Sequence, residues 1–269
     1  MDKRLRIGLN IVLGLVVAVG LAVLAGQRLG WRESAQAQEK AARAAGFAPA
    51  SQAPAEQPPE AEPPGREDAP EMDDPAAQEL AGIDLAALRE VNPDTAAWIY
   101  IPGTNISYPV MQGADNDYYL RHTWEKKWNS GGSIFLDWHS ARDFEGFHTI
   151  VYGHHMNNGT MFGALEGYAD EGFWREHPYV YVADGSCVRR YEVFAAWEAR
   201  VDSLVYAHGD TPEERQALIE LCVGSSWVDT GIVPEVEDKL LTLSTCTGQG
   251  SYTVRWVVQA RLEQVWPAQ

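Results

Sequence analysis

Residues 240–258 read LLTLSTCTGQGSYTVRWVV and decide the fold of this chain. An apolar, threonine-rich run ends at Cys246, a turn with two glycines follows, and a second β-branched run begins at Tyr252. Two such runs joined by a short turn predict an antiparallel pair of strands. In that pairing Arg255, nine positions after Cys246, returns to the neighbourhood of the thiol.

The predicted pairing puts a permanent cation beside an accessible thiol at the end of a strand. Because a guanidinium stays protonated, Arg255 could stabilise a thiolate and donate hydrogen bonds to the oxyanion of a tetrahedral intermediate. If the strands do not pair in this way, Arg255 is an ordinary surface residue of an edge strand. Cys246 is therefore the candidate nucleophile and Arg255 its candidate partner.

A cysteine nucleophile needs a base, and His154 is the best candidate among the seven histidines. It follows the β-branched run 148–152 and Gly153, at the point where a strand opens into a polar loop. Strand alternation puts His154 on the same face as Tyr152 and puts His155 on the opposite face. We therefore expect His154, and not His155, to face the site. The alternative is that His154 is a structural residue whose ring only makes hydrogen bonds within the fold.

Short β-like runs separated by turn residues make up most of the C-terminal part. They are residues 98–101, 133–136, 148–152, 179–182, 190–194, 240–243 and 252–258. Many short strands at this spacing suggest a closed barrel or a sandwich. A helical lead-in is expected at 83–91, and Thr211 followed by Pro212 marks the start of a helix over 211–223 between two late strands.

Three motifs, in this order and spacing, resemble the sortases. Residues 242–246 match their Thr-Leu-x-Thr-Cys signature, residues 152–154 look like their histidine strand, and Arg255 falls where their arginine follows the cysteine. Further stretches resemble class B sortases: residues 92–94, 98–104, 117–120, 132–137, 154–156 and 159–162. The resemblance covers about residues 83–265 and implies a mainly β fold, a closed sortase-type β-barrel with N-terminal helices and one helix inserted between late strands.

This resemblance implies a cysteine transpeptidase. Cys246 would attack a backbone carbonyl in the C-terminal sorting motif of a secreted protein and form a thioacyl-enzyme, which an amine of a peptidoglycan cross-bridge or a pilin lysine would resolve. His154 would act as general acid to the leaving amine and as base to the incoming one, and Arg255 would clamp the oxyanion and the substrate. Tyr152 and Thr245 are candidate substrate-binding residues, with ordinary barrel packing as their alternative role.

Two other functions fit the same residues. In a Cys–His hydrolase, water instead of an amine would resolve the thioacyl intermediate. In a non-catalytic, anchored β domain, some of the ten tryptophans and eleven tyrosines would bind the cell wall, although aromatic side chains are more often part of a core. The second function requires Cys246, His154 and Arg255 to lie apart.

Residues 7–26 form an apolar run long enough to cross a hydrocarbon core of about 30 Å. Lys3, Arg4 and Arg6 precede the run, and by the positive-inside rule they keep the N terminus in the cytoplasm. We therefore predict a cytoplasmic tip and transmembrane anchor over 1–32, a single pass through the cell membrane and an extracellular catalytic domain. A cleaved signal peptide is the alternative, and it would export the chain equally.

The remaining domain boundaries follow from composition. Residues 33–82 are rich in alanine, proline and acidic side chains and predict an extracellular linker, in which 33–45 could continue as a helix. Residues 83–269 form the predicted catalytic domain. Because 21 basic residues face 38 acidic ones, a net charge of −17, we exclude nucleic acid as a partner.

The cysteine count bears on metals and disulfides. Cys187, Cys222 and Cys246 contain no Cys-x-x-Cys pair and are too few for a four-cysteine zinc site. We interpret Cys187 and Cys222 as small buried side chains in preference to a disulfide. No cofactor and no metal ion are expected.

Overall fold

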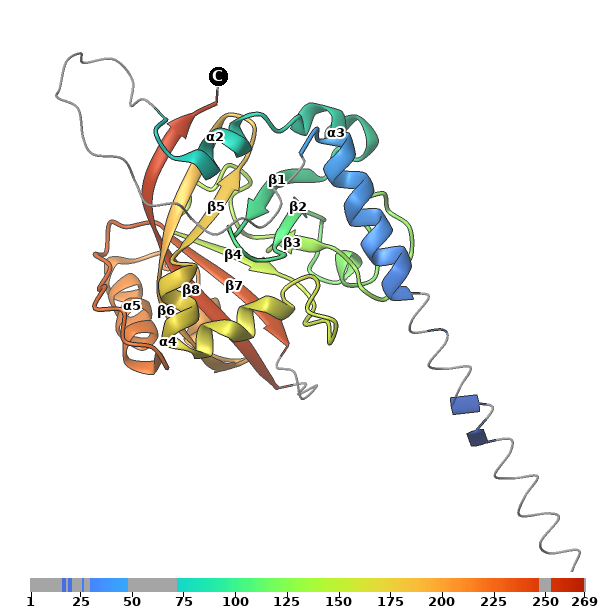
Figure 1. Ribbon diagram of the computed structural model, residues 1–269. Coiled ribbons are helices and arrows are strands. Elements are labelled where there is room, and N and C mark those ends of the chain that lie inside the picture. Colours follow the sequence, from blue (N-terminus) through green and yellow to red (C-terminus); the bar gives the residue numbers. More distant parts are fainter. Residues whose placement is uncertain are drawn as a thin grey trace, which may run out of the picture.

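A computed structural model describes most of the C-terminal part of the chain (Figure 1). The described residues are 16–17, 19–20, 26, 30–47, 72–246 and 253–268, with Cys246 described by its backbone. Within these residues, no helix combines the length and the apolar character that crossing a membrane requires. The predicted span 7–26 lies mostly outside them.

Eight strands close into a barrel, in the order β1-β2-β3-β4-β7-β8-β6-β5 (Figure 1). The strands are β1 (Thr95–Tyr100), β2 (Ser107–Met111), β3 (Ile134–Leu136), β4 (His148–Tyr152), β5 (Tyr179–Ala183), β6 (Cys187–Arg200), β7 (Leu240–Cys246) and β8 (Val254–Pro267). The prediction of a mainly β fold with a closed barrel is confirmed.

Alternation along β7 shows how the barrel is filled. Leu241 and Leu243 are fully buried in the main core cluster inside the barrel. Leu240 is equally buried but belongs to a second cluster outside the barrel, together with Leu218 and Cys222. A strand covered on both faces reads as a nearly continuous apolar run, which is why this stretch was recognisable in the sequence.

The helices after residue 72 are short except for one. They are α2 (Pro75–Ala81), α3 (Leu85–Val91), α4 (Glu171–Glu176) and α5 (Pro212–Ser225), with 3-10 turns η1 (Tyr118–Leu120), η2 (Gly163–Ala169) and η3 (Leu204–Tyr206). The predicted helix between late strands is α5, and a capping box between Thr211 and Glu214 begins it. Its buried side chains cover the outer face of β6, β7 and β8.

Strand β2 was missing from the prediction because it contains Pro109, which suggests a turn. The pairing explains how the proline is tolerated. Pro109 lies opposite Trp98 of β1, while the pairing of β2 with β3 begins one residue later, at Val110. Pro109 therefore sits where β2 has a partner on one side only, and its missing N–H breaks no ladder between two neighbours.

The N-terminal part of the predicted linker is packed against the barrel domain. Residues 30–44 form a helix, drawn in blue in Figure 1. Ala41 and Ala45 are fully buried in one cluster with Trp124, whose indole Nε1 donates a hydrogen bond of 2.8 Å to the carbonyl of Ala37. This segment and α2 thus belong to the packed body, although composition placed both in a linker.

The burial of His148, at the start of β4, predicts that the protein loses stability in acid. It is fully buried, with Nδ1 donating to the Ala207 carbonyl at 2.7 Å and Nε2 lying 2.5 Å from the Thr242 hydroxyl. Burial lowers the pKa of His148 to about 4, helped by the charge of His208 and opposed by that of Asp137. Because the unfolded imidazole takes up a proton near pH 6.5, stability is complete above pH 6.5 and falls towards pH 4.

The expected loss is about 3 kcal/mol between pH 7 and pH 4, from a pKa difference of about 2.5 units. The measurement is the free energy of unfolding by urea at several pH values, for the wild-type chain and for His148→Gln. Carboxylates titrate in both proteins, so their contribution cancels in the comparison. Equal pH dependence in the two proteins would contradict a buried neutral His148.

Candidate active site

Strands β7 and β8 bring together the two residues at the ends of the predicted hairpin. They pair antiparallel from Leu240 opposite Arg261 to Cys246 opposite Arg255. The predicted return of Arg255 to the end of β7 is therefore present in the backbone register. Arg255 is half-buried, and its Nη1 donates a hydrogen bond of 3.0 Å to the carbonyl of Val254.

The parallel pairing of β4 with β7 brings the histidine to the same end of the barrel. Tyr152 lies opposite Ser244, and the ladder continues with a 3.1 Å bond from the Gly153 amide to the Ser244 carbonyl. His154 therefore leaves β4 beside the last residues of β7. Gly153 is required at this point, because a Cβ there would lie 2.4 Å from the side chain of Ile134 and 2.7 Å from that of Phe162.

A pocket of about 330 Å³ opens at this end of the barrel. Its lining residues are Asn116, Leu120, Phe135, Tyr152, Gly153, His154, Val201, Tyr206, Ser244, Thr245 and Arg255. The lining combines apolar and aromatic side chains with five polar residues, as in many small-ligand and peptide sites. Of the five predicted site residues, the four whose side chains are described, His154, Arg255, Tyr152 and Thr245, all line this pocket.

The ring of His154 is oriented by a backbone carbonyl. Nε2 lies 2.7 Å from the carbonyl oxygen of Leu120, the last residue of η1. A carbonyl only accepts, so Nε2 carries the proton in this hydrogen bond and Nδ1 is the nitrogen left to exchange a proton.

A buried hydrogen-bond chain holds η1 in place for this contact. The Asn92 side chain donates to the Tyr119 hydroxyl at 2.9 Å, and this hydroxyl donates to Asp94 Oδ2 at 2.7 Å. Tyr119 is fully buried, and burial raises its pKa, so it remains a phenol and a donor. Asn92 and Asp94, which stood out in the sequence as part of a motif, thus position the Leu120 carbonyl from a distance.

His155 has a different environment from His154. It does not line the pocket, and its backbone forms an isolated bridge with Met161. Its Nε2 lies 3.7 Å from Glu166 Oε2, and its buried Nδ1 has no hydrogen-bond partner among the described residues. His154 therefore lines the pocket, and His155 does not.

Tyr152 and Thr245 contribute different surfaces to the pocket. The ring of Tyr152 stacks on Tyr206 with centroids 6.4 Å apart and packs against Phe135 at 5.4 Å. Burial, reinforced by the charge of Asp137, raises the pKa of Tyr152, which stays a neutral donor to Asp137 Oδ2 at 3.3 Å. The Thr245 hydroxyl is buried and makes no hydrogen bond within the described part of the chain.

Other pocket residues were not predicted from sequence. Asn116 and Leu120 come from the segment between β2 and β3, and Val201 and Tyr206 come from the segment between β6 and α5. Tyr206 places its hydroxyl 3.0 Å from Ser244 Oγ. These residues lie in irregular segments, so no periodicity in the sequence points to them.

The remaining cysteines lie elsewhere. Cys187 and Cys222 are both free, as the interpretation without a mutual disulfide requires. Cys222 is buried on α5, whereas Cys187 at the start of β6 is only half-buried, which differs from the expected buried position. Burial raises the pKa of both thiols, so neither is an activated nucleophile.

The chain is similar to sortases both in sequence and in structure. Residues 99–263 match the sortase domain model. Over 182 residues the chain is 33% identical to sortase B of Listeria monocytogenes, covering 66% of this chain and 74% of that protein. The Staphylococcus aureus sortase B–substrate complex superposes with a TM-score of 0.63 and 28% identity, covering 70% of this chain and 86% of the other. A sortase B complexed with triglycine also gives 0.63 and 28%, over 67% and 85% of the chains.

Proposed function

This chain belongs to the sortase family, within class B, and from that premise we propose that it is a membrane-anchored cysteine transpeptidase. Its substrates are secreted proteins that carry a C-terminal sorting motif. Cys246 cleaves the motif through a thioacyl-enzyme, and an amine of a peptidoglycan cross-bridge or a pilin lysine takes over the acyl group. The product is a protein attached covalently at the cell surface.

The observation that carries this proposal is the register at one end of the barrel. Cys246 lies directly opposite Arg255 in the β7–β8 ladder, and the β4–β7 ladder ends where His154 begins. Directly opposed residues in an antiparallel pair are within reach of one another's side chains. The hairpin that carries Cys246 and Arg255 and the distant segment that carries His154 therefore meet at one end of the barrel, which is the arrangement that a cysteine transpeptidase would need.

Each step assigns one proton or one bond to a named residue. The Cys246 thiolate attacks the scissile carbonyl carbon, and the Arg255 guanidinium stabilises the negative charge that develops on the carbonyl oxygen. As the C–N bond breaks, protonated His154 gives its Nδ1 proton to the departing amine. In the second half, His154 takes a proton from the incoming amine, whose nitrogen replaces the sulfur on the carbonyl carbon.

Two relatives support the choice of substrates. A sortase B of Staphylococcus aureus has been solved with its substrate, and a sortase B has been solved with triglycine, a peptide with a free amino group. The pocket suits such ligands, since Tyr152, Tyr206 and Phe135 provide an apolar wall for a peptide side chain. Tyr152 and Thr245 are the proposed substrate-binding residues.

The membrane anchor rests on the sequence, in which the apolar run 7–26 follows Lys3, Arg4 and Arg6. Residues 30–44 begin four positions after Gly26 and are docked on the barrel domain. The proposed anchor would therefore hold the catalytic domain close to the outer face of the membrane.

The test is mass spectrometry of the full-length chain incubated with a library of sorting-motif peptides, with and without triglycine. An acyl adduct on Cys246 that passes to triglycine would establish transpeptidation. An adduct that is released only to water, at the same rate with and without triglycine, would assign a hydrolase instead. Absence of any adduct, with a Cys246 thiol that iodoacetamide still alkylates, would favour a binding domain.

Substitution of Arg255 tests its role at the oxyanion. We expect Arg255→Ala to lower kcat/KM for the transfer about 10²–10³-fold, the usual loss of one oxyanion donor. Arg255→Lys keeps the charge but loses the planar fork, so we expect only partial recovery. Arg261→Ala is the control, because Arg261 lies on the same strand, pairs with Glu192 at 2.7 Å and does not line the pocket. Activity of Arg255→Ala within a few-fold of the control would contradict the assignment.

A further inference from the structure

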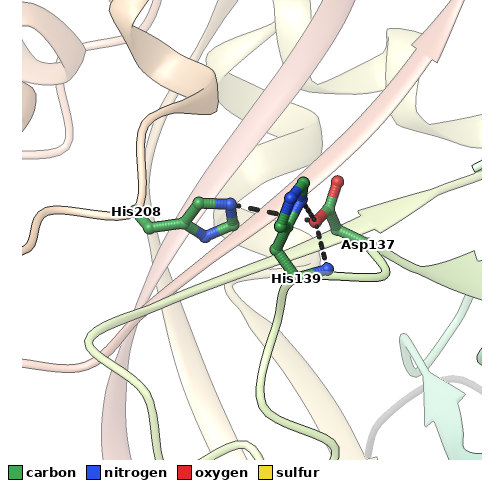
Figure 2. A group of neighbouring side chains, drawn as sticks. All are labelled: Asp137, His139 and His208. Carbon is green, nitrogen blue, oxygen red and sulfur yellow. Dashed lines mark hydrogen bonds and ion pairs between the residues drawn. The ribbon is translucent and has the colours of Figure 1, made fainter. Parts of the chain in front are cut away.

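Asp137, His139 and His208 form a cluster of side chains beside the pocket (Figure 2). Asp137 and His139 follow β3, and His208 follows η3, so the cluster joins two segments that are 69 positions apart in the sequence. Figure 2 shows the His208 ring pointing across to His139 and to the Asp137 carboxylate. None of the three has a role in the transfer described above.

The distances suit a metal ion. His139 Nδ1 lies 3.4 Å and His208 Nε2 lies 3.8 Å from Asp137 Oδ1, and the three ligand atoms are all within 4.8 Å of one another. Ligand bonds of about 2.0–2.1 Å in a tetrahedral arrangement place ligand atoms roughly 3.3 Å apart. The separation of Asp137 and His139 already matches this spacing, and His208 would have to move closer for the site to close around an ion.

The carboxylate is already oriented for this task. Asp137 is 4% exposed, and its Oδ2 accepts hydrogen bonds from Asn116 Nδ2 at 2.7 Å and from the Tyr152 hydroxyl at 3.3 Å. The amide of His139 donates to Oδ1 at 2.9 Å. Hydrogen bonds of this kind orient metal-binding carboxylates and hold them in place.

We propose that Asp137, His139 and His208 bind a divalent transition-metal ion, zinc being the type that two imidazoles and one carboxylate fit best. The His139 side chain is 54% exposed and that of His208 is 34% exposed, so water reaches the cluster and completes the coordination. The ion would be bound through nitrogen and oxygen only. Cys246 and His154 take no part in the site.

Binding would connect two segments that line the substrate pocket. His208 lies two residues after Tyr206 and seven after Val201, which both line the pocket, and Asp137 is bonded to Asn116 and Tyr152, which line it from other segments. A bound ion would therefore hold the segment between β6 and α5 against the β3–β4 loop. The ion is structural, and its effect on the pocket is to fix the position of that wall.

The experiment is equilibrium dialysis of the full-length Cys246→Ala chain against zinc at about pH 7.5, with the metal content measured by atomic absorption. Removing Cys246 excludes a competing thiolate ligand. We expect the chain to bind one zinc ion. The double variant, in which both His139→Ala and His208→Ala are made, should bind zinc at least about 100-fold more weakly. Either substitution alone should also weaken zinc binding. His122→Ala is the matched control, because His122 is also half-exposed and stacks on Tyr118 as His139 packs on Trp138.

Two further readouts separate this site from other zinc ligands. Cobalt in place of zinc should give visible d–d absorption with no thiolate-to-cobalt charge-transfer band. The thermal midpoint should rise about 5–10 °C at a hundredfold excess of zinc over Kd, and the double variant should not show the rise. Unchanged binding by the double variant, or a thiolate band from Cys187 or Cys222, would overturn the proposal. Because peptide transfer is not measured, the result is independent of the proposed function.

Discussion

Cys246→Ala is expected to abolish both the acyl adduct and the transfer product, with a fall in kcat/KM of at least about 10⁴-fold. The reason is chemical, since no other described thiol can take over. Cys222 is buried on α5, and Cys187 lies at the start of β6, away from the pocket. The measurement is the rate of peptide transfer to triglycine, followed by mass spectrometry of the intact chain.

Cys187→Ala is the control for this substitution. It removes a half-buried thiol whose pKa burial raises, and it leaves the pocket unchanged. We expect its adduct formation to equal that of the wild-type chain. An adduct on the Cys246→Ala chain, or a loss of the adduct in Cys187→Ala, would show that Cys246 is not the nucleophile.

His154→Ala is expected to lower the transfer rate about 10³-fold, within the range for loss of a general acid and base. His155→Ala should keep most of the activity, because His155 lies outside the pocket, near Glu166. The pair is a sharp comparison, since the two residues are neighbours and the same side chain is removed. A His155→Ala chain as inactive as His154→Ala would reverse the assignment.

Chemical rescue tests the interpretation of His154. Imidazole added to the His154→Ala chain should restore part of its activity, since it fills the space left by the missing ring. Loss of a merely structural histidine would not be rescued in this way.

The sequence identified much of the catalytic end of the barrel. Residues 240–246 predicted a buried strand, and the glycine turn after them predicted a hairpin. The register of that hairpin places Arg255 opposite Cys246. Alternation along 148–152 likewise separated His154 from His155. Such short-range inferences succeed because a strand has a fixed period of two and a tight turn leaves few registers.

Other parts of the site were not accessible to this reasoning. Strand β2 was hidden by Pro109, and the helix over 30–44 was assigned to a linker because its alanines carry no strong signal of burial. Both depend on partners far along the chain. Ala41 is buried in one cluster with Trp124, and Pro109 is tolerated because the pairing of β2 with β3 begins only after it.

By itself the sequence determined every barrel strand except β2, the helix at α5, and the residues whose chemistry suits a cysteine transpeptidase. Only the tertiary structure decided that the Leu120 carbonyl holds His154, that Tyr206 stacks on Tyr152, and that His208 reaches Asp137 and His139. The physical reason is the range of the interaction. The alternation of a strand and the residues of a turn depend on neighbouring positions in the chain. Contacts between irregular segments form only after the barrel has closed and brought those segments together.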